Sequence, residues 1–228
     1  AVALDVNFID TADIYQSNAS ETTIGRALHP LPSGVVVATK GGMIRPSGVD
    51  GHPEYLRRAV EGSLQRLGLD CLPLYQLHRV DPTVPIEESV GALRDMRAEG
   101  KIRDIGLSNV TVEEIERARR VVPIASVQNQ YNIHDRRSEN VVDFCTEHEI
   151  AFLPWTPLMR GDLRAETTLG EVATQYAVTA HQLALRWLLR RSPWILPIPG
   201  TLSERHLEEN LAAASIDLSD ADFERLSG

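Results

Sequence analysis

The sequence predicts an α/β fold, a closed (β/α)8 TIM-type barrel that forms a single domain over residues 1–228. Three observations predict this fold. Short apolar, β-branched runs alternate with amphipathic helical stretches, which is typical of parallel strands covered by helices. No GxGxxG motif follows an early strand, and this disfavours an open doubly wound sheet. Polar residues come directly at strand ends, where a barrel gathers them on one rim.

We expect seven strands and seven helices along the chain. The strand candidates are residues 8–9, 35–39, 72–77, 102–107, 124–128, 151–154 and 195–198. The helix candidates are 55–67, 86–97, 115–122, 141–148, 169–176, 182–191 and 207–214. In the first of these helices Leu56, Val60 and Leu67 share one face at helical spacing. Thr111 and Ser203 precede glutamates and are the expected N-caps.

Seven strands are one fewer than a closed barrel requires. The opening residues, AVALDV, resemble the end of a helix that runs straight into a strand. We therefore expect the barrel to be incomplete at its N-terminus, without its first strand and most of the following helix. Edge strands left exposed in this way are an aggregation hazard.

Composition and charge exclude several classes of protein. The formal net charge of −9 disfavours nucleic acid and membrane surfaces as partners, because binding to phosphates requires concentrated Lys and Arg. No apolar run approaches the length of about 20 residues that a transmembrane helix needs, and the N-terminus lacks the pattern of a signal peptide. Cys71 and Cys145 lie far apart without CxxC spacing, which favours a reducing, cytoplasmic location. No metal site is predicted.

Four residues at or near strand ends form a possible chemical unit: Asp10, Tyr15, Lys40 and His78. Taken singly, each is more often a cap, a packing residue, a surface lysine or a satisfied histidine. Together they offer a phenol, a cation, an anion and an imidazole. Phenols titrate near pH ~10, and a neighbouring ammonium group favours the phenolate. If Asp10 orients Lys40, Tyr15 can act as a general acid towards a reacting oxygen that His78 binds.

These four residues resemble, in order, the Asp-Tyr-Lys-His tetrad of the aldo-keto reductase superfamily. The resemblance continues through GKIRDIGLSN, VQNQYNI, FLPWTPL, ALRWLLR and IPGTLSERHLEENLAA, and so covers almost the whole chain. The GLSNVT and IPGT segments are similar to those of bacterial or plant-type members. The resemblance implies an NADP-dependent carbonyl reductase, with NAD as a possible cofactor. It also implies a monomer whose substrate is a small aldehyde or ketone.

The resemblance further assigns residues to the cofactor. It places Ser108, Asn109 and Gln128 on the nicotinamide carboxamide, Trp155 on the nicotinamide ring, and the loop from Leu158 with Arg160 over the pyrophosphate. The residues that it places at the adenosine end are Gly200, Thr201, Arg205, His206, Glu209 and Asn210. Many members have Lys and Arg where this chain has Gly200 and His206, which puts a preference for NADP in doubt, although Arg205 can substitute.

We hypothesise that hydride passes from NADPH to the carbonyl carbon while Tyr15 protonates the oxygen. One alternative is a protein that binds the cofactor without useful turnover, or an inactive truncated family member. Another is an unrelated barrel enzyme, such as a phosphate-sugar aldolase that uses Lys40 to form a Schiff base. Consumption of NADPH with a reactive aldehyde, and trapping by borohydride, distinguish these functions.

Overall fold

The computed structural model describes residues 1–158 and 167–228 of the chain. These residues form two compact units, Ala1–Gln128 and Asn129–Gly228. The single-domain organisation expected from the sequence remains a prediction. Within the described residues, each helix is too short or too polar to cross a membrane.

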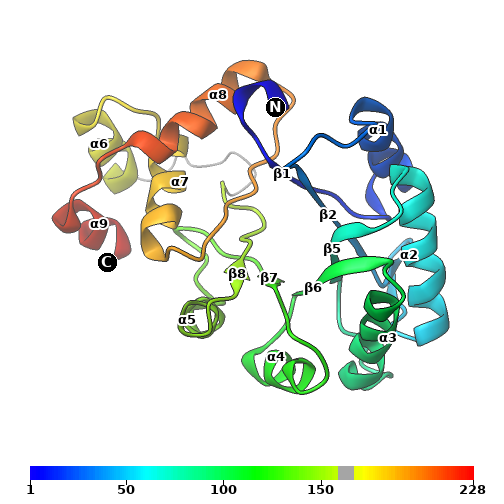
Figure 1. Ribbon diagram of the computed structural model, residues 1–228. Coiled ribbons are helices and arrows are strands. Elements are labelled where there is room, and N and C mark those ends of the chain that lie inside the picture. Colours follow the sequence, from blue (N-terminus) through cyan, green and yellow to red (C-terminus); the bar gives the residue numbers. More distant parts are fainter. Residues whose placement is uncertain (159–166) are drawn as a thin grey trace. The chain divides into compact units, whose positions relative to one another are not determined.

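Parallel strands form the centre of the first unit (Figure 1). In spatial order they are β1 (Phe8–Asp10), β2 (Val36–Gly41), β5 (Leu72–Leu77), β6 (Ile102–Ser108) and β7 (Ser126–Gln128). Each strand pairs with the next of these along the chain. A doubly wound sheet reverses its strand order at a switch point, whereas a barrel does not. The topology therefore agrees with the predicted barrel.

Helices follow these strands and pack side by side along one face of the sheet (Figure 1). They are α1 (Ala19–Ala27), α2 (Pro53–Leu67), α3 (Ile86–Ala98) and α4 (Val112–Arg119). Strand β5 is buried along its whole length, as expected for a strand covered on both faces. A short antiparallel hairpin, β3 (Met43–Ile44) and β4 (Gly48–Val49), follows β2. The sequence did not predict this hairpin, because strands of two residues carry no measurable alternation.

Outside residues 159–166, the second unit contains one strand and mostly helices. Its elements are α5 (Glu139–Glu147), β8 (Ala151–Phe152), α6 (Thr167–Gln175), α7 (Ala180–Arg191), α8 (Glu204–Ala212), the 3₁₀ helix η4 (Ala213–Ser215) and α9 (Asp220–Ser227). Its core includes the buried ring of Trp187, which stacks against the rings of both Tyr131 and Phe223.

The seventh predicted strand, 195–198, is not a strand. Ile195 forms only an isolated parallel bridge with Phe152. The Phe152 N–H donates to the Trp194 carbonyl at 2.7 Å, and the Leu196 N–H donates to the Phe152 carbonyl at 2.9 Å. The segment therefore runs in the predicted direction beside β8, but two hydrogen bonds are too few to form a ladder.

Two helices were absent from the prediction, and all the predicted helices except α3 begin two or three residues earlier than predicted. In α1 only Glu21 is buried, so the segment has no apolar stripe that indicates a helix; α9 buries only Leu226. Helix α4 begins at Val112 because Thr111 forms a capping box with Glu114. Ser203 caps α8 by accepting a hydrogen bond from a backbone N–H, as predicted.

The register of the first unit places its polar residues at one edge of the sheet. Lys40 pairs with Gln76 across β2 and β5, and Ser108 pairs with Gln128 across β6 and β7. All four lie towards the carboxyl ends of their strands, where Asp10 ends β1. Because parallel strands align these ends, residues far apart in sequence converge there.

Close packing between α1 and α2 predicts that Gly25→Ala destabilises the protein. A Cβ at Gly25 would lie 2.5 Å from the Arg66 carbonyl oxygen, which is backbone and cannot rotate away. We expect a loss of about 1–3 kcal/mol in unfolding free energy, measured by urea denaturation. Gly91→Ala in α3 is the matched control, because a Cβ there meets nothing within 4 Å. It should stabilise by about 0.5–1 kcal/mol through helix propensity. Equal effects of the two substitutions would contradict this packing argument.

Candidate active site

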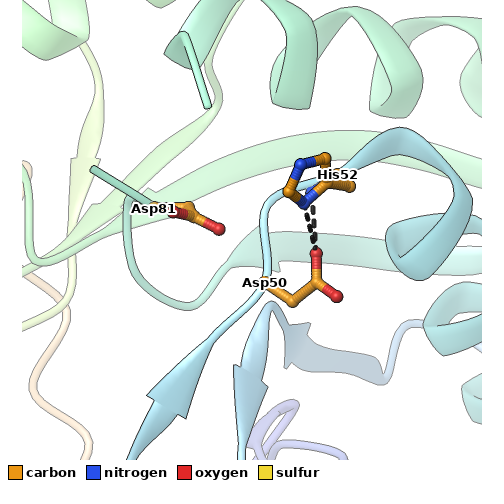
Figure 2. Close-up of side chains that lie close together, drawn as sticks. All are labelled: Asp50, His52 and Asp81. Atoms are coloured by element: carbon orange, nitrogen blue, oxygen red, sulfur yellow. Dashed lines mark hydrogen bonds and ion pairs between the residues drawn. The ribbon is translucent and has the colours of Figure 1, made fainter. Parts of the chain in front are cut away.

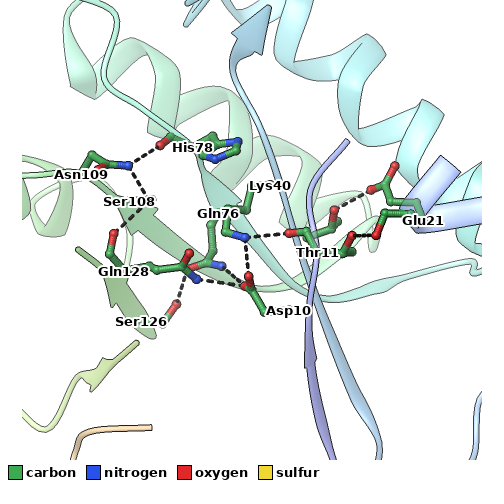
Figure 3. Close-up of polar contacts among 12 residues, drawn as sticks. Asp10, Thr11, Glu21, Lys40, Gln76, His78, Ser108, Asn109, Ser126 and Gln128 are labelled. Carbon is green, nitrogen blue, oxygen red and sulfur yellow. Dashed lines mark hydrogen bonds and ion pairs between the residues drawn. The ribbon is translucent and has the colours of Figure 1, made fainter. Parts of the chain in front are cut away.

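A buried ion pair forms the centre of the site. The Lys40 side chain is 0% exposed, and its Nζ donates to Asp10 Oδ2 at 2.7 Å and to the Thr11 carbonyl at 2.7 Å (Figure 3). Burial of an ammonium group is costly unless a counter-charge and hydrogen-bond acceptors surround it. Asp10 and Thr11 supply both, so Lys40 is held as a charged group in one orientation.

Two glutamines engage the other oxygen of Asp10. Gln128 Nε2 donates to Asp10 Oδ1 at 2.9 Å, and Gln76 Nε2 approaches the same oxygen at 3.4 Å (Figure 3). Ser126 Oγ lies 3.4 Å from Gln76 Oε1 and extends this polar layer. Gln128 was predicted from the sequence as a cofactor-binding residue, whereas Gln76 was not predicted. A glutamine within the apolar strand LPLYQL, two residues before His78, was the available signal.

Tyr15 lies against this ion pair. It begins the 3₁₀ segment η2 (Tyr15–Asn18), and the residue is 39% exposed. Lys40 Nζ lies 5.1 Å from the centroid of the Tyr15 ring. The Tyr15 and His78 rings meet edge to face, with centroids 5.9 Å apart. The structure thus brings together the four residues Asp10, Tyr15, Lys40 and His78.

His78 is a neutral imidazole at neutral pH. It follows β5 and is 8% exposed. Burial, together with the positive charges of Lys40 and Arg79, lowers its pKa to about 3. Its Nδ1 is buried and has no hydrogen-bond partner within the described residues. The tautomer with its proton on Nε2 avoids burying an unpaired N–H, and so leaves Nε2 as the donor.

Hydroxyl and amide groups gather beside His78. Asn109 has a left-handed backbone (φ 58°), and its Nδ2 donates to the His78 carbonyl at 3.2 Å and to Ser108 Oγ at 2.9 Å. Ser108 Oγ in turn donates to the Gln128 carbonyl at 2.9 Å (Figure 3). The three residues predicted to bind a carboxamide therefore form one connected group. Amide and hydroxyl side chains offer both donors and acceptors, which a primary carboxamide requires.

The remaining predicted cofactor residues belong to the second unit. The backbone N–H of Trp155 donates to the Asn129 carbonyl at 3.0 Å. Leu158 follows in the sequence and lies in a turn. Arg160 lies outside the described residues. The other predicted residues flank or form the first turns of α8: Gly200, Thr201, Arg205, His206, Glu209 and Asn210.

The start of α8 is a solvent-facing helix N-terminus. Thr201 Oγ1 accepts from the Ser203 N–H at 3.1 Å. The side chain of Arg205 is 74% exposed, and it reaches Glu209 at 2.9 Å and His206 Nε2 at 3.0 Å. Backbone N–H groups at helix N-termini and arginine side chains are both suited to phosphate.

A second group of titratable residues lies in the loops of the first unit (Figure 2). Atoms of Asp50, His52 and Asp81 that can bind a metal lie within 4.8 Å of one another. Asp50 Oδ1 accepts from the His52 N–H at 3.0 Å and from its ring nitrogen at 2.9 Å. Asp81 accepts from the Gly51 N–H at 3.0 Å and from the Thr83 N–H at 2.9 Å. Asp81 therefore ties the loop before α2 to the loop after His78.

Comparison with known proteins gives a family match over the whole chain. The family model described as "Aldo/keto reductase family" matches residues 1–228. An uncharacterised oxidoreductase of Schizosaccharomyces pombe is 44% identical over 228 residues, which cover 98% of this chain and 74% of the relative. Pyridoxine 4-dehydrogenase of Escherichia coli is 38% identical over 238 residues, covering 100% of this chain and 83% of the relative.

Solved structures show the same fold. A thermostable aldo-keto reductase crystallised with the inhibitor epalrestat superimposes with a TM-score of 0.91 at 30% identity, covering 99% of this chain and 83% of the other. An aldo/keto reductase of Klebsiella pneumoniae, in complex with NADP and acetate, gives a TM-score of 0.83 at 31% identity, covering 96% and 78%. The predicted barrel fold is thus confirmed. Because the family model matches residues 1–228, the chain belongs to the aldo/keto reductase family of oxidoreductases.

Proposed function

We propose that this protein reduces an aldehyde or ketone to an alcohol with NADPH, and that Tyr15 donates the proton. The observation that carries the proposal is the position of Lys40, which is held charged by Asp10 and lies against the ring of Tyr15 beside His78. The Klebsiella pneumoniae relative in complex with NADP supports the choice of cofactor.

The residues beside His78 fit the nicotinamide end of such a cofactor. Ser108, Asn109 and Gln128 present amide and hydroxyl groups at the strand ends. We assign them to the carboxamide, and Trp155 to the face of the ring. We assign the exposed N-terminus of α8 to the adenosine phosphates. When bound, the cofactor supplies a hydride to the carbonyl carbon.

Tyr15 delivers the proton that completes the reduction. As negative charge develops on the carbonyl oxygen, the Tyr15 hydroxyl donates its proton to that oxygen and becomes a phenolate. The fixed positive charge of Lys40 stabilises the phenolate by Coulomb attraction, which is strong where water is excluded. Because Tyr15 is 39% exposed, solvent can return a proton to it after each turnover.

His78 binds the carbonyl oxygen without giving up a proton. Burial keeps its pKa at about 3, so the imidazole is neutral and its Nε2–H acts only as a hydrogen-bond donor. This hydrogen bond orients the carbonyl group towards Tyr15. The two side chains therefore have separate roles, since His78 positions and polarises the oxygen while Tyr15 protonates it.

The substrate, assembly and location of the protein remain proposals. The name of the Escherichia coli relative, pyridoxine 4-dehydrogenase, makes a pyridine aldehyde and alcohol pair a first substrate to test. We propose a monomer, as the family resemblance implies. We propose that it works in the cytoplasm, since two widely spaced cysteines, Cys71 and Cys145, in a chain of this length are typical of a reducing compartment.

Loss of the phenol should abolish reduction. We expect Tyr15→Phe to lower kcat for a nitrobenzaldehyde at least about hundredfold, because general acid catalysis is lost. NADPH consumption measures kcat, and quenching of tryptophan fluorescence measures NADPH binding, which should be unchanged. Tyr176→Phe, which removes an unrelated hydroxyl of the second unit, is the control. Near-normal turnover by Tyr15→Phe would refute the mechanism. A wild type that binds NADPH but never consumes it would favour the non-catalytic alternative.

The low pKa of His78 predicts an acid-dependent loss of stability. Between about pH 6.5 and pH 3 the unfolded chain binds a proton that the folded imidazole does not. The contribution of His78 to stability is therefore present above about pH 6.5 and declines as the pH falls. Both proteins should lose unfolding free energy between about pH 7 and pH 5. We expect the loss in His78→Gln to be smaller than that in wild type by about 1–2 kcal/mol. Urea denaturation at both pH values measures this, and identical losses would contradict the assignment.

Arg205 should favour NADPH over NADH. Its exposed guanidinium at the start of α8 is placed to bind a phosphate that NADH lacks. We expect Arg205→Ala to raise KM for NADPH about tenfold and to leave KM for NADH within twofold, in steady-state assays with each cofactor. Arg225→Ala, which removes an arginine paired with Glu171, is the control. An equal rise in both KM values would show that Arg205 does not bind the phosphate that distinguishes NADPH from NADH.

A further inference from the structure

The loop that ends at Tyr15 is fixed by individual contacts rather than by regular structure. Residues 11–14 lie outside helices and strands. The Asp13 N–H donates to the Lys40 carbonyl at 3.0 Å, and the Asp13 carbonyl accepts from Asn18 Nδ2 at 2.7 Å. Immediately after Tyr15, the backbone of Gln16 and Ser17 is left-handed, with φ values of 48° and 53°. Such conformations cost free energy in residues other than glycine, so surrounding contacts must hold this loop.

Two buried polar groups beside this loop have no hydrogen-bond partner. Asp13 is 6% exposed and Tyr75 is 0% exposed. Within the described residues, neither Asp13 Oδ1 nor the Tyr75 hydroxyl forms a hydrogen bond. Buried polar atoms are almost always paired in native proteins, so two unpaired atoms in one region require an explanation.

Gly41 shows that these two side chains reach the same place. A Cβ at this position would lie 2.1 Å from the Tyr75 hydroxyl oxygen and 3.1 Å from Asp13 Oδ2. Any side chain would therefore occupy the space towards which both groups point. Glycine at this position lets the hydroxyl and the carboxyl group approach each other, directly after Lys40 in β2.

We propose that Asp13 and Tyr75 form a buried positioning pair, in which the Tyr75 hydroxyl donates a hydrogen bond to the Asp13 carboxylate beside Gly41 and thereby holds Tyr15 next to Lys40. Forming the bond requires a small rotation of either side chain into the space that Gly41 leaves open, which would satisfy both groups. The kinetic consequence of the pair rests on the function proposed above, whereas the existence of the pair does not. Asp13 and Tyr75 are positioning residues, since they act on the reaction through Tyr15.

The electrostatic surroundings give each partner its role. Burial and the charge of Glu21 raise the pKa of Asp13, the Ile14 N–H, Arg66 and Lys40 lower it, and the net result is a pKa of about 6. Asp13 is therefore an ionised acceptor at neutral pH. Burial likewise raises the pKa of Tyr75 well above its ordinary value, so Tyr75 keeps its proton and remains a donor. The charged or titratable groups around the pair are Glu21 from α1, Lys40 from β2, and Tyr55 and Arg66 from α2.

The pair can be detected without any enzyme assay. A hydrogen bond to a carboxylate favours its ionised form. Removal of the Tyr75 hydroxyl should therefore raise the pKa of Asp13 further, by about one pH unit. Carbon NMR titration of the Asp13 carboxyl group in wild type and Tyr75→Phe measures this change. Tyr131→Phe is the matched control, because it removes a buried hydroxyl that donates to Glu139 in the second unit. A pKa of Asp13 that is the same in wild type and Tyr75→Phe overturns the pair.

Kinetics test whether the pair positions Tyr15. We expect Tyr75→Phe and Asp13→Ala each to lower kcat about tenfold, with KM for NADPH within twofold, because small displacements of a catalytic group are costly. Asp13→Asn, whose amide oxygen still accepts the hydrogen bond, should stay within threefold of wild type. The double variant Asp13→Ala/Tyr75→Phe should lose no more than the worse single variant. Tyr131→Phe should retain kcat.

The outcomes separate this inference from the proposed function. If the wild type reduces no carbonyl compound, the proposed function fails, and the NMR titration alone decides whether the pair exists. If the wild type is active and the double variant loses kcat by the product of the two single losses, the two residues act independently. That result overturns the positioning role. Equal damage by Asp13→Asn and Asp13→Ala overturns it as well, since an acceptor at this position would then be irrelevant.

Discussion

The buried ion pair between Lys40 and Asp10 is the interaction on which the rest of the site depends. An ammonium group with no exposed surface is stable only when acceptors surround it, and here Asp10 and the Thr11 carbonyl supply them at 2.7 Å. The pair joins β1 to β2 and fixes the start of the loop that leads to Tyr15. It also places a positive charge near His78, where it helps to keep the imidazole neutral.

Strand register turns this single pair into a polar layer. Asp10 carries one oxygen for Lys40 and one for the glutamines Gln76 and Gln128, which belong to different strands. Strand ends hold these groups rigidly, because ladder hydrogen bonds fix the backbone on either side. Tyr15 is the exception, since it lies on a loop. Its position depends on contacts from that loop to β2 rather than on a ladder.

Much of this arrangement is predictable from sequence because it follows patterns that local physics imposes. The apolar runs at 72–77 and 102–107 predict buried strands, and the amphipathic pattern at 55–67 predicts a helix, as observed. The segment 195–198 was wrongly predicted as a strand, because its apolar composition is that of a strand while only Ile195 finds a pairing partner. Gln76 was overlooked although it stands within an apolar strand, since only the structure shows the partners that give its buried amide a role.

By itself, the sequence determined the alternation of strands and helices, the barrel class and most of the residues that meet at the strand ends, although not Gln76. Hydrophobic periodicity encodes the strands and helices residue by residue, and the polar residues were found because they follow the apolar strands. Only the tertiary structure decided how the side chains share charges and protons. It placed Lys40 against the Tyr15 ring, gave both oxygens of Asp10 their partners, and left Asp13 and Tyr75 buried side by side at Gly41. Such features depend on burial and on distances between residues far apart in the chain, which no local pattern records.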